Sequence, residues 1–292
     1  MPSRHHVTDK SLPILYEKVK EYVADQINKA EAVSFTTDIW SSSVSPVSMI
    51  SLTAHWVDTS TFTLKSAVLH ATEFRGSHTA NAIGEKVREM FARWKITMDK
   101  FHVVLRDNAS NMRKAFEDMQ AASLGCFAHS LQLVVKEGLL SQRSVKDALA
   151  KARGIIGHFK HSPLATSRFE DIQRELGATE TKRLLQDVAT RWNSSFYMIQ
   201  SMLELRRAIS SYGTEHKLPS TLTANEWALL EKVAHVLEPF EEVTKKISLS
   251  TSTAAEVIPH VSSLKIALAE ETPEDTGIKT MKTTLLESVQ KI

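Results

Sequence analysis

Strand-type hydrophobic patterns in this chain stop before residue 130, and a helical pattern continues from there to the end. Three segments, 33–40, 47–57 and 62–74, have strand composition or alternation and are joined by short connections. Two shorter β-type runs follow at 101–107 and 124–127. Because apolar residues recur every second position in a half-buried strand and about every 3.6 positions in a helix, we expect an α/β region followed by an all-α region.

The order of the predicted elements restricts the topology further. A helix is predicted over 11–30, another from a possible N-cap at Ser77 to about Trp94, and a third over 108–119. The strands and the helices between them therefore follow the order β-β-β-α-β-α-β. Short connections imply an antiparallel meander for the first three strands. This is the element order of an RNase H-like sheet, in which the first and fourth strands are parallel neighbours joined by a right-handed crossover.

These patterns predict three regions. Residues 1–30 form an N-terminal helix, residues 31–145 form part of an RNase H-like core, and residues 146–292 form part of an all-α domain.

Composition excludes several classes of protein. With 42% hydrophobic and 24% charged residues, the chain has the make-up of a globular protein. Apolar runs such as 131–135 are far too short to span a bilayer, and residues 1–6 lack the apolar core of a secretory signal. The single cysteine, Cys126, cannot form an internal disulfide, which favours a reducing compartment. We expect no membrane partner and an intracellular location.

Charge is distributed unevenly along the chain. Residues 131–213 contain 13 Lys and Arg against 8 Asp and Glu, whereas residues 214–292 contain 8 against 12. The basic stretch could face nucleic-acid phosphates, or it could be a set of solvated helix faces.

Two aspartates end up close together if the first and fourth strands are neighbours. Asp38 lies late in the first strand, and Asp107 lies at the end of the fourth. Two adjacent carboxylates repel each other unless they share a cation, and Mg²⁺ or Mn²⁺ suits such oxygen ligands. The alternative is structural, because Asp107 followed by Asn108 could simply cap the next helix.

Four segments resemble the hAT-family transposases, and especially the zinc finger BED domain-containing proteins derived from them. They are 34–42 (SFTTDIWSS), 105–112 (LRDNASNM), 126–129 (CFAH) and 187–194 (DVATRWNS), in the order seen in that family. The resemblance covers most of the chain. It implies an RNase H-like catalytic domain interrupted by a long helical insertion domain.

The resemblance also implies roles for individual residues. Asp38 and Asp107 match the first two members of an acidic triad that binds Mg²⁺ or Mn²⁺ for DNA cleavage and strand transfer. Trp192 matches a tryptophan that stacks on a flipped base, with Arg191 beside it as a phosphate contact. Without the resemblance, Trp192 would be interpreted as a core residue near the start of a helix.

Cys126 and His129 match the family's Cys-x-x-His pair beside the active site. The pair has only half the spacing of a zinc site, so we expect no zinc in this chain. A buried cysteine and a hydrogen-bonded histidine at a strand–helix junction are the simpler interpretation.

The sequence departs from the family pattern in three respects. The third acid of the family, a glutamate after the insertion domain, has no counterpart, and the glutamates of 214–292 lie in amphipathic helical patterns. We also find no counterpart in this sequence to the family's BED zinc finger or to its C-terminal dimerisation region. We therefore expect a homo-oligomer only if such a region exists outside this chain.

Two functions follow from these observations. The first is a hAT transposase-like DNA-binding protein in the nucleus, whose catalytic competence is in doubt because the acidic triad is incomplete. The second is a domesticated, non-catalytic nuclear protein that regulates transcription or binds a protein partner.

Overall fold

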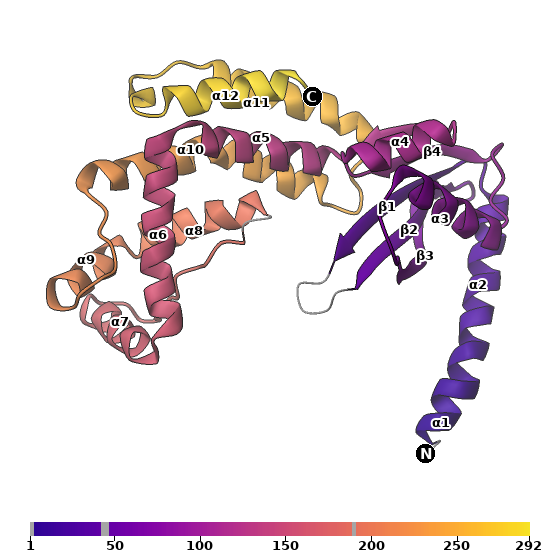
Figure 1. The fold of residues 1–292 in the computed structure, drawn as a ribbon, viewed down its shortest axis with the longest axis horizontal. Helices are drawn as coiled ribbons and strands as arrows, with labels where there is room; N and C mark the ends of the chain where they lie inside the picture. The colour runs from indigo at the N-terminus through magenta and orange to yellow at the C-terminus, as the bar shows by residue number, and fades with distance from the viewer. Residues whose placement is uncertain (1–2, 42–46, 189–190) are drawn as a thin grey trace. The chain divides into compact units, whose positions relative to one another are not determined.

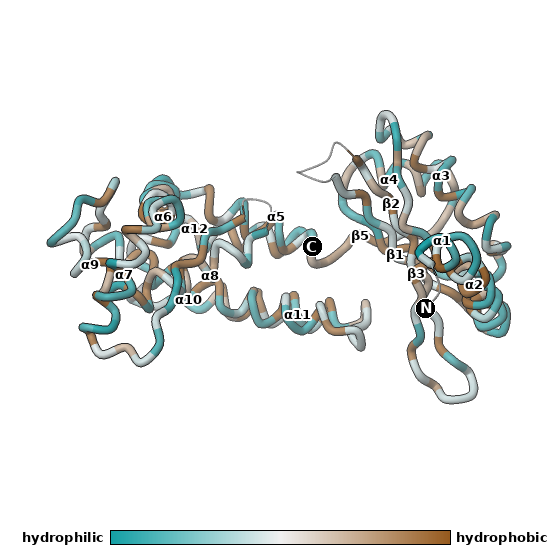
Figure 2. The backbone as a smooth tube through the Cα atoms, turned by 90° about the horizontal axis from the view of Figure 1, so that it is seen from below, coloured by the Kyte–Doolittle hydropathy of each residue, from teal (hydrophilic) through white to brown (hydrophobic). Residues whose placement is uncertain are grey.

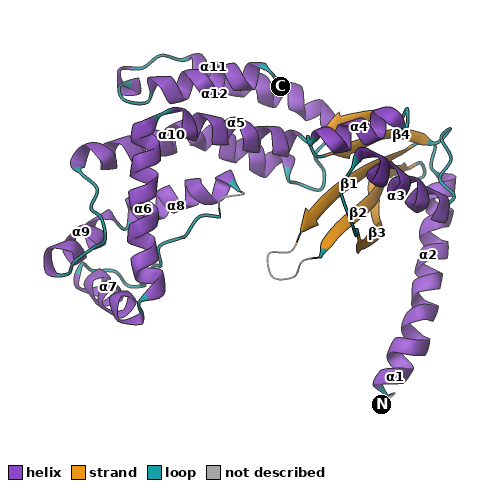
Figure 3. Ribbon diagram, in the orientation of Figure 1, coloured by secondary structure: helices purple, strands orange, loops and turns teal. Residues whose placement is uncertain are grey.

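The computed structural model describes residues 3–41, 47–188 and 191–292. The chain divides into two compact units, Met1–His129 and Ser130–Ile292, which are described separately below (Figure 1). All the strands that the structure describes belong to the first unit, and the second is helical (Figure 3).

The first unit is built on a five-stranded sheet with the order β3-β2-β1-β4-β5. Its strands are β1 (Val33–Ser41), β2 (Ser48–Asp58), β3 (Thr63–Glu73), β4 (Phe101–Arg106) and β5 (Ser123–Gly125). The first three strands form the predicted antiparallel meander. β4 pairs with β1 in parallel, and β5 pairs with β4 in parallel. The predicted neighbours, the first and fourth strands, are thus confirmed. Residues 42–46 of the connection between β1 and β2 lie outside the described residues.

One face of this sheet forms the core of the first unit. Alternate residues of the central strands, such as Phe35, Ile50 and Leu52, are fully buried there. Helices α3 (Ala80–Arg93) and α4 (Ser110–Asp118) supply the opposing side chains, among them Ile83 and Phe116. The burial pattern of β1 places Val33, Phe35 and Thr37 in the core and turns the even-numbered residues to the other face.

The N-cap of α3 is Thr79 and not Ser77, so the predicted start of this helix was two residues early. The Thr79 hydroxyl accepts a hydrogen bond from the backbone N–H of Ala82 at 3.3 Å. Serine and threonine are both good N-caps, and residue type alone does not choose between two candidates this close together.

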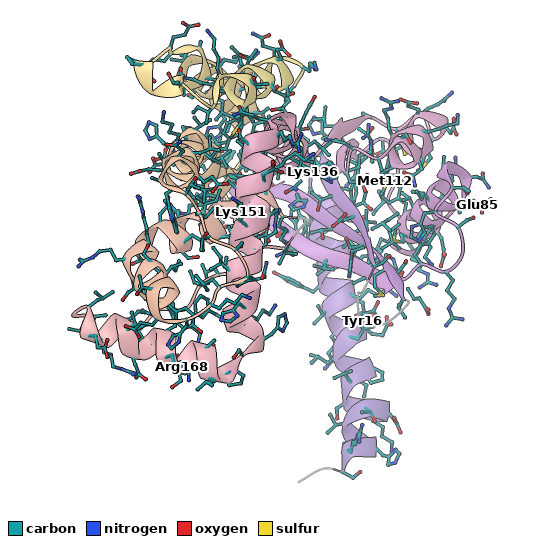
Figure 4. The ribbon with its side chains drawn as sticks, turned by 60° about the vertical axis from the view of Figure 1, so that its left-hand side comes forward. Tyr16, Glu85, Met112, Lys136, Lys151 and Arg168 are labelled. Carbon is teal, nitrogen blue, oxygen red and sulfur yellow. The ribbon has the colours of Figure 1, made fainter. Side chains whose placement is uncertain are left out.

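The N-terminal segment is helical, as predicted. It consists of α1 (Arg4–His6), a π-helical turn (Val7–Ser11) and α2 (Leu12–Lys29). Only the C-terminal end of α2 packs against the sheet unit, where Ile27 is buried. Its apolar residues nearer the N-terminus are exposed, Tyr16 among them (Figure 4).

The second unit is a bundle of helices. They are α5 (Phe127–Ser141), α6 (Arg143–His161), α7 (Pro163–Glu175), α8 (Trp192–Glu204), α9 (Arg206–Glu215), α10 (Ala224–Ile247), α11 (Val257–Ala269) and α12 (Lys279–Gln290). Two short 3₁₀ turns, Ala254–Glu256 and Pro273–Asp275, flank α11. Leu131, Ile155, Met198 and Phe240 are among the fully buried side chains of this unit.

The boundary between the two units differs from the predicted one at 145/146. It falls between His129 and Ser130, because α5 is bonded to other helices of the second unit: Gln132 accepts from the Trp192 N–H, and Glu137 accepts from Ser288. No described helix has the length and hydrophobicity needed to cross a membrane.

Candidate functional site

Three parallel strands bring the two predicted aspartates and Cys126 to one edge of the sheet. β1, β4 and β5 run in the same direction, so their carboxyl ends lie at the same edge. Thr36 pairs with Leu105 in the β1–β4 register. Asp38 follows Thr36 by two positions within β1, and Asp107 follows Leu105 by two positions, directly after β4 ends at Arg106. The register therefore aligns the two aspartates.

Asp38 is turned away from the core. Its neighbour Thr37 is buried and donates its hydroxyl to the Ser51 carbonyl at 2.7 Å, whereas Asp38 is exposed on the other face. The Asp38 Oδ1 atom accepts the backbone N–H of Ile39 at 2.9 Å.

The environment of Asp38 disfavours its negative charge. Partial desolvation of the carboxyl group raises the pKa of Asp38, and the negative charge of Asp107 raises it further. The Ile39 N–H and the nearby His129 act in the opposite direction. The two aspartates thus interact electrostatically, as two carboxylates that could share a cation would.

Asp107 has a structural role as well. Its Oδ1 atom accepts the backbone N–H of Ala109 at 3.0 Å, in an Asx turn that leads into α4. The buried Arg106 donates from Nη1 to the Asp107 carbonyl at 2.9 Å and from Nε to Ser123 on β5. The turn interpretation and the site interpretation of Asp107 are therefore compatible, because the bond to Ala109 uses Oδ1 and a carboxylate has two oxygens.

Cys126 and His129 lie at the junction between β5 and α5. The Cys126 N–H donates to the Arg106 carbonyl at 2.7 Å, and the Cys126 carbonyl accepts from Nδ2 of Asn108 at 3.4 Å. Both Cys126 and His129 are half-buried. A Cβ on Gly125 would clash with the Asn108 side chain, which explains the glycine at the end of β5.

The two carboxylates at this edge of the sheet could supply part of the coordination shell of a hard divalent cation. Mg²⁺ is commonly held by one or two carboxylates and completes its shell with water and substrate phosphates. Asp38 and Asp107 provide such a pair. Over residues 3–41, 47–188 and 191–292, no group of three or more His, Cys, Asp or Glu side chains is placed to hold a metal ion.

Trp192 and Arg191 lie in the second unit, at the start of α8. Trp192 is 4% exposed and packs near the rings of Phe196 and Phe240. Its backbone N–H donates to Gln132 Oε1 at 2.7 Å. Arg191 is exposed. Base stacking by Trp192 stays a prediction, and it would require the indole to leave this buried position.

Asp187 is a residue whose role sequence reasoning missed, although it opens the 187–194 segment. Its carboxylate is 4% exposed and accepts hydrogen bonds from Arg153 of α6 and Ser195 of α8. These bonds tie the Asp187 carboxylate to both α6 and α8. The only sequence signal was an acidic residue eight positions before a serine, which has no diagnostic value. Residues 189–190 of the same segment lie outside the described residues.

The fold and the paired carboxylates together define a class of protein. A mixed five-stranded sheet with aligned aspartates on its central parallel strands, followed by a helical unit, fits an RNase H-like core with a helical domain. Two family models match consecutive parts of the chain. The ZBED1 RNase-like domain matches residues 36–125, and the ZBED1 RNase-like helical domain matches residues 124–236.

Similar proteins extend these matches beyond the two domains. The human zinc finger BED domain-containing protein 4 is 29% identical over 99% of this chain, and human zinc finger BED domain-containing protein 6 is 28% identical over 92%. The putative AC transposase of maize is 26% identical over 85%. The chain belongs to the transposase-derived proteins of the hAT and BED type.

This chain matches only part of each of those relatives. It spans 25% and 28% of the two human proteins and 32% of the maize protein. Among solved structures, the Drosophila P element transposase strand transfer complex aligns with all of this chain and 73% of its own, at a TM-score of 0.35 and 10% identity. That likeness is too slight to carry an argument about function.

Proposed function

We propose that this chain is a divalent-cation-binding and DNA-binding part of a hAT transposase-like protein. Asp38 and Asp107 would hold Mg²⁺ or Mn²⁺. Exposed Lys and Arg side chains of the 131–213 stretch in the helical unit would hold the DNA backbone. The observation that carries the proposal is the alignment and electrostatic interaction of the two aspartates.

The cation would neutralise negative charge where a phosphodiester approaches the sheet edge. Asp38 and Asp107 would contribute one or more oxygens each, while their backbone hydrogen bonds from Ile39 and Ala109 keep the carboxylates oriented. Cleavage through two ions commonly uses more carboxylates than this pair. We therefore propose that these residues by themselves bind DNA more effectively than they cut it.

The helical unit offers cationic side chains that suit a phosphate backbone. Lys160, Arg168 and Arg207 are exposed, and in the described part of the chain none of them forms an ion pair within 4.0 Å. Figure 4 labels Arg168 of this set. Some basic residues of the 131–213 stretch are instead paired with an acid, as Lys151 is with Glu226 at 2.7 Å. Free surface cations of this kind bind phosphates with a strong dependence on salt.

The test is DNA binding by the full chain, measured by fluorescence anisotropy with and without Mn²⁺ over a series of salt concentrations. We expect affinity to fall steeply with salt and to rise on addition of Mn²⁺. The Mn²⁺-dependent part should disappear in Asp38→Asn and in Asp107→Asn. Asp147→Asn, at an exposed position on α6, is the matched control and should bind like the parent chain.

Two results would overturn the proposal. An affinity for DNA that does not change with salt would contradict a phosphate-dominated interface. A Mn²⁺ effect of equal size in the parent chain and in both aspartate variants would show that the cation binds elsewhere.

We also propose a nuclear location, since a chain that binds chromosomal DNA has to reach it. The second candidate that we propose is a domesticated, non-catalytic nuclear protein that regulates transcription or binds a protein partner. Fluorescence microscopy of the tagged chain tests the location, and exclusion of the chain from the nucleus would contradict it.

A further inference from the structure

A groove in the helical unit is lined by residues of α10, of α11 and of the segment that leads from α11 into α12. Figure 1 labels these three helices. Its volume is about 940 Å³, and its α10 wall extends from Ala228 to Glu242. At a rise of about 1.5 Å per residue, that wall is about 21 Å long, which is close to four turns of a second helix.

The walls of the groove are partly apolar and leave room for an occupant. Ala228 on α10 and Ala267 on α11 are small and exposed, and Val236 and Pro239 are half-buried beside them. Figure 2 shows α11 with hydrophobic and hydrophilic residues interspersed along its length. Apolar surface of this kind favours the apolar side of an amphipathic helix.

Acidic side chains border the same groove. Glu231, Glu238 and Glu242 recur on one face of α10 at helical spacing, and Glu270 follows the end of α11. All four are exposed. Within the described ranges, Glu231, Glu242 and Glu270 have no ion-pair partner within 4.0 Å, and Glu238 approaches only His235, at 3.9 Å.

The two lysines of the groove are already engaged. Lys282 is largely buried and pairs with Asp275 at 2.9 Å. Lys232 donates from Nζ to the Thr276 carbonyl at 2.9 Å. Lys282 and Asp275 cancel each other's charge, so the groove as a whole presents excess negative charge to an occupant.

We propose that this groove binds a lysine- or arginine-rich amphipathic helix of a partner protein. The incoming helix would place its apolar face against Val236, Pro239 and Ala267 and its cations beside the glutamates. The same glutamates repel a phosphate backbone. The partner of the groove is therefore different from the DNA that the exposed cations of the 131–213 stretch would bind. The inference does not depend on cation binding by Asp38 and Asp107 or on DNA binding by the helical unit.

The test uses the full chain and a fluorescein-labelled synthetic helical peptide with leucines on one face and lysines on the other. Anisotropy gives its affinity for the parent chain and for Glu231→Lys/Glu238→Lys. We expect the double variant to bind more than about tenfold more weakly. Glu175→Lys, at an exposed position on α7 outside the groove, is the charge control and should reduce affinity by less than about twofold.

A second variant separates a seated helix from diffuse attraction. Ala267→Trp fills the groove without changing any charge. We expect it to lower the affinity for the lysine peptide as much as the double charge reversal does. A counterpart peptide with glutamates in place of the lysines should not bind. Equal affinities of the lysine peptide for the parent, the groove variants and Glu175→Lys would overturn the proposal. Loss of affinity in Glu175→Lys as large as in the double variant would overturn it too.

Discussion

Arg153 holds Asp187 through parallel hydrogen bonds, with Nε donating to Oδ1 at 3.1 Å and Nη2 donating to Oδ2 at 2.7 Å. The side chain of Asp187 is 4% exposed and that of Arg153 is 43% exposed. Ser195 of α8 donates to Oδ2 at 2.9 Å as well. A single buried carboxylate therefore connects α6 to the first turns of α8, where Trp192 lies.

This asymmetry of burial predicts unequal effects of two truncations. Arg153→Ala leaves a buried carboxylate without its cation and should lower the free energy of unfolding by about 2–4 kcal/mol. Asp187→Ala leaves an arginine that water can solvate and should cost about 1–2 kcal/mol. Urea unfolding of the full chain measures both. Arg143→Ala, on the same helix at a fully accessible position, should change stability by less than about 0.5 kcal/mol. A larger loss from Asp187→Ala than from Arg153→Ala would contradict this account of the pair.

Asp187 also predicts how stability depends on pH. Although burial opposes it, hydrogen bonds from Arg153 and Ser195 hold the pKa of Asp187 below its ordinary value of 3.8. A depressed carboxyl pKa contributes stability that is fully present above the unfolded value and is lost as pH falls through the folded value. The stability advantage of the parent chain over Asp187→Asn should therefore shrink between about pH 5 and about pH 2. An advantage that stays constant down to the acid transition would show that Asp187 keeps an ordinary pKa.

Close packing between α5 and α12 predicts the effect of adding one methyl group. A Cβ on Gly138 would lie 2.5 Å from Cδ2 and 2.6 Å from Cγ of Leu285. Gly138→Ala should therefore destabilise the chain by about 1–3 kcal/mol despite the better helix propensity of alanine. Gly157→Ala on α6 is the matched control, because nothing lies within 4 Å of its added Cβ. That control should stabilise the chain by about 0.5–1 kcal/mol. Equal effects at the two glycines would mean that the two helices are not in close contact.

Burial of Trp192 makes base stacking a measurable change of environment. In chain labelled with 5-fluorotryptophan, the resonance absent from Trp192→Phe belongs to this indole. It should show no solvent isotope shift in the free chain, because the residue is 4% exposed. If the ring stacks on a base, DNA with an unpaired base near its centre should shift this resonance, and fully paired DNA should not. A resonance unaffected by either DNA would assign Trp192 to the core alone, whereas a solvent-exposed signal in the free chain would contradict the burial.

Much of the sheet unit was predictable because its signals are local. The alternation in 33–40 and 47–57 marks strands, and the element order then makes the first and fourth strands neighbours. That step alone brings Asp38 and Asp107 together, since each lies two positions beyond the aligned pair Thr36 and Leu105.

Other features depend on tertiary contacts that no local pattern encodes. Exposure of the apolar stripe on α2, with Leu12 at 60% and Tyr22 at 66%, could not be inferred, since helical spacing does not show whether anything covers a face. The buried environment of Asp187 depends on Arg153, which is 34 residues earlier in the chain. The assignment of α5 to the helical unit likewise depends on which neighbours bury Leu131 and Val135.

The most direct test of the cation site is a double-mutant cycle on Mn²⁺ affinity. Water-proton relaxation measures Mn²⁺ binding to the parent chain, Asp38→Asn, Asp107→Asn and the double variant. If the two carboxylates share one ion, each single variant should lose most of the affinity, and the double variant should lose little more than either. Single losses that add up in the double variant, or a parent affinity kept in all three, would show that Asp38 and Asp107 do not hold a common cation.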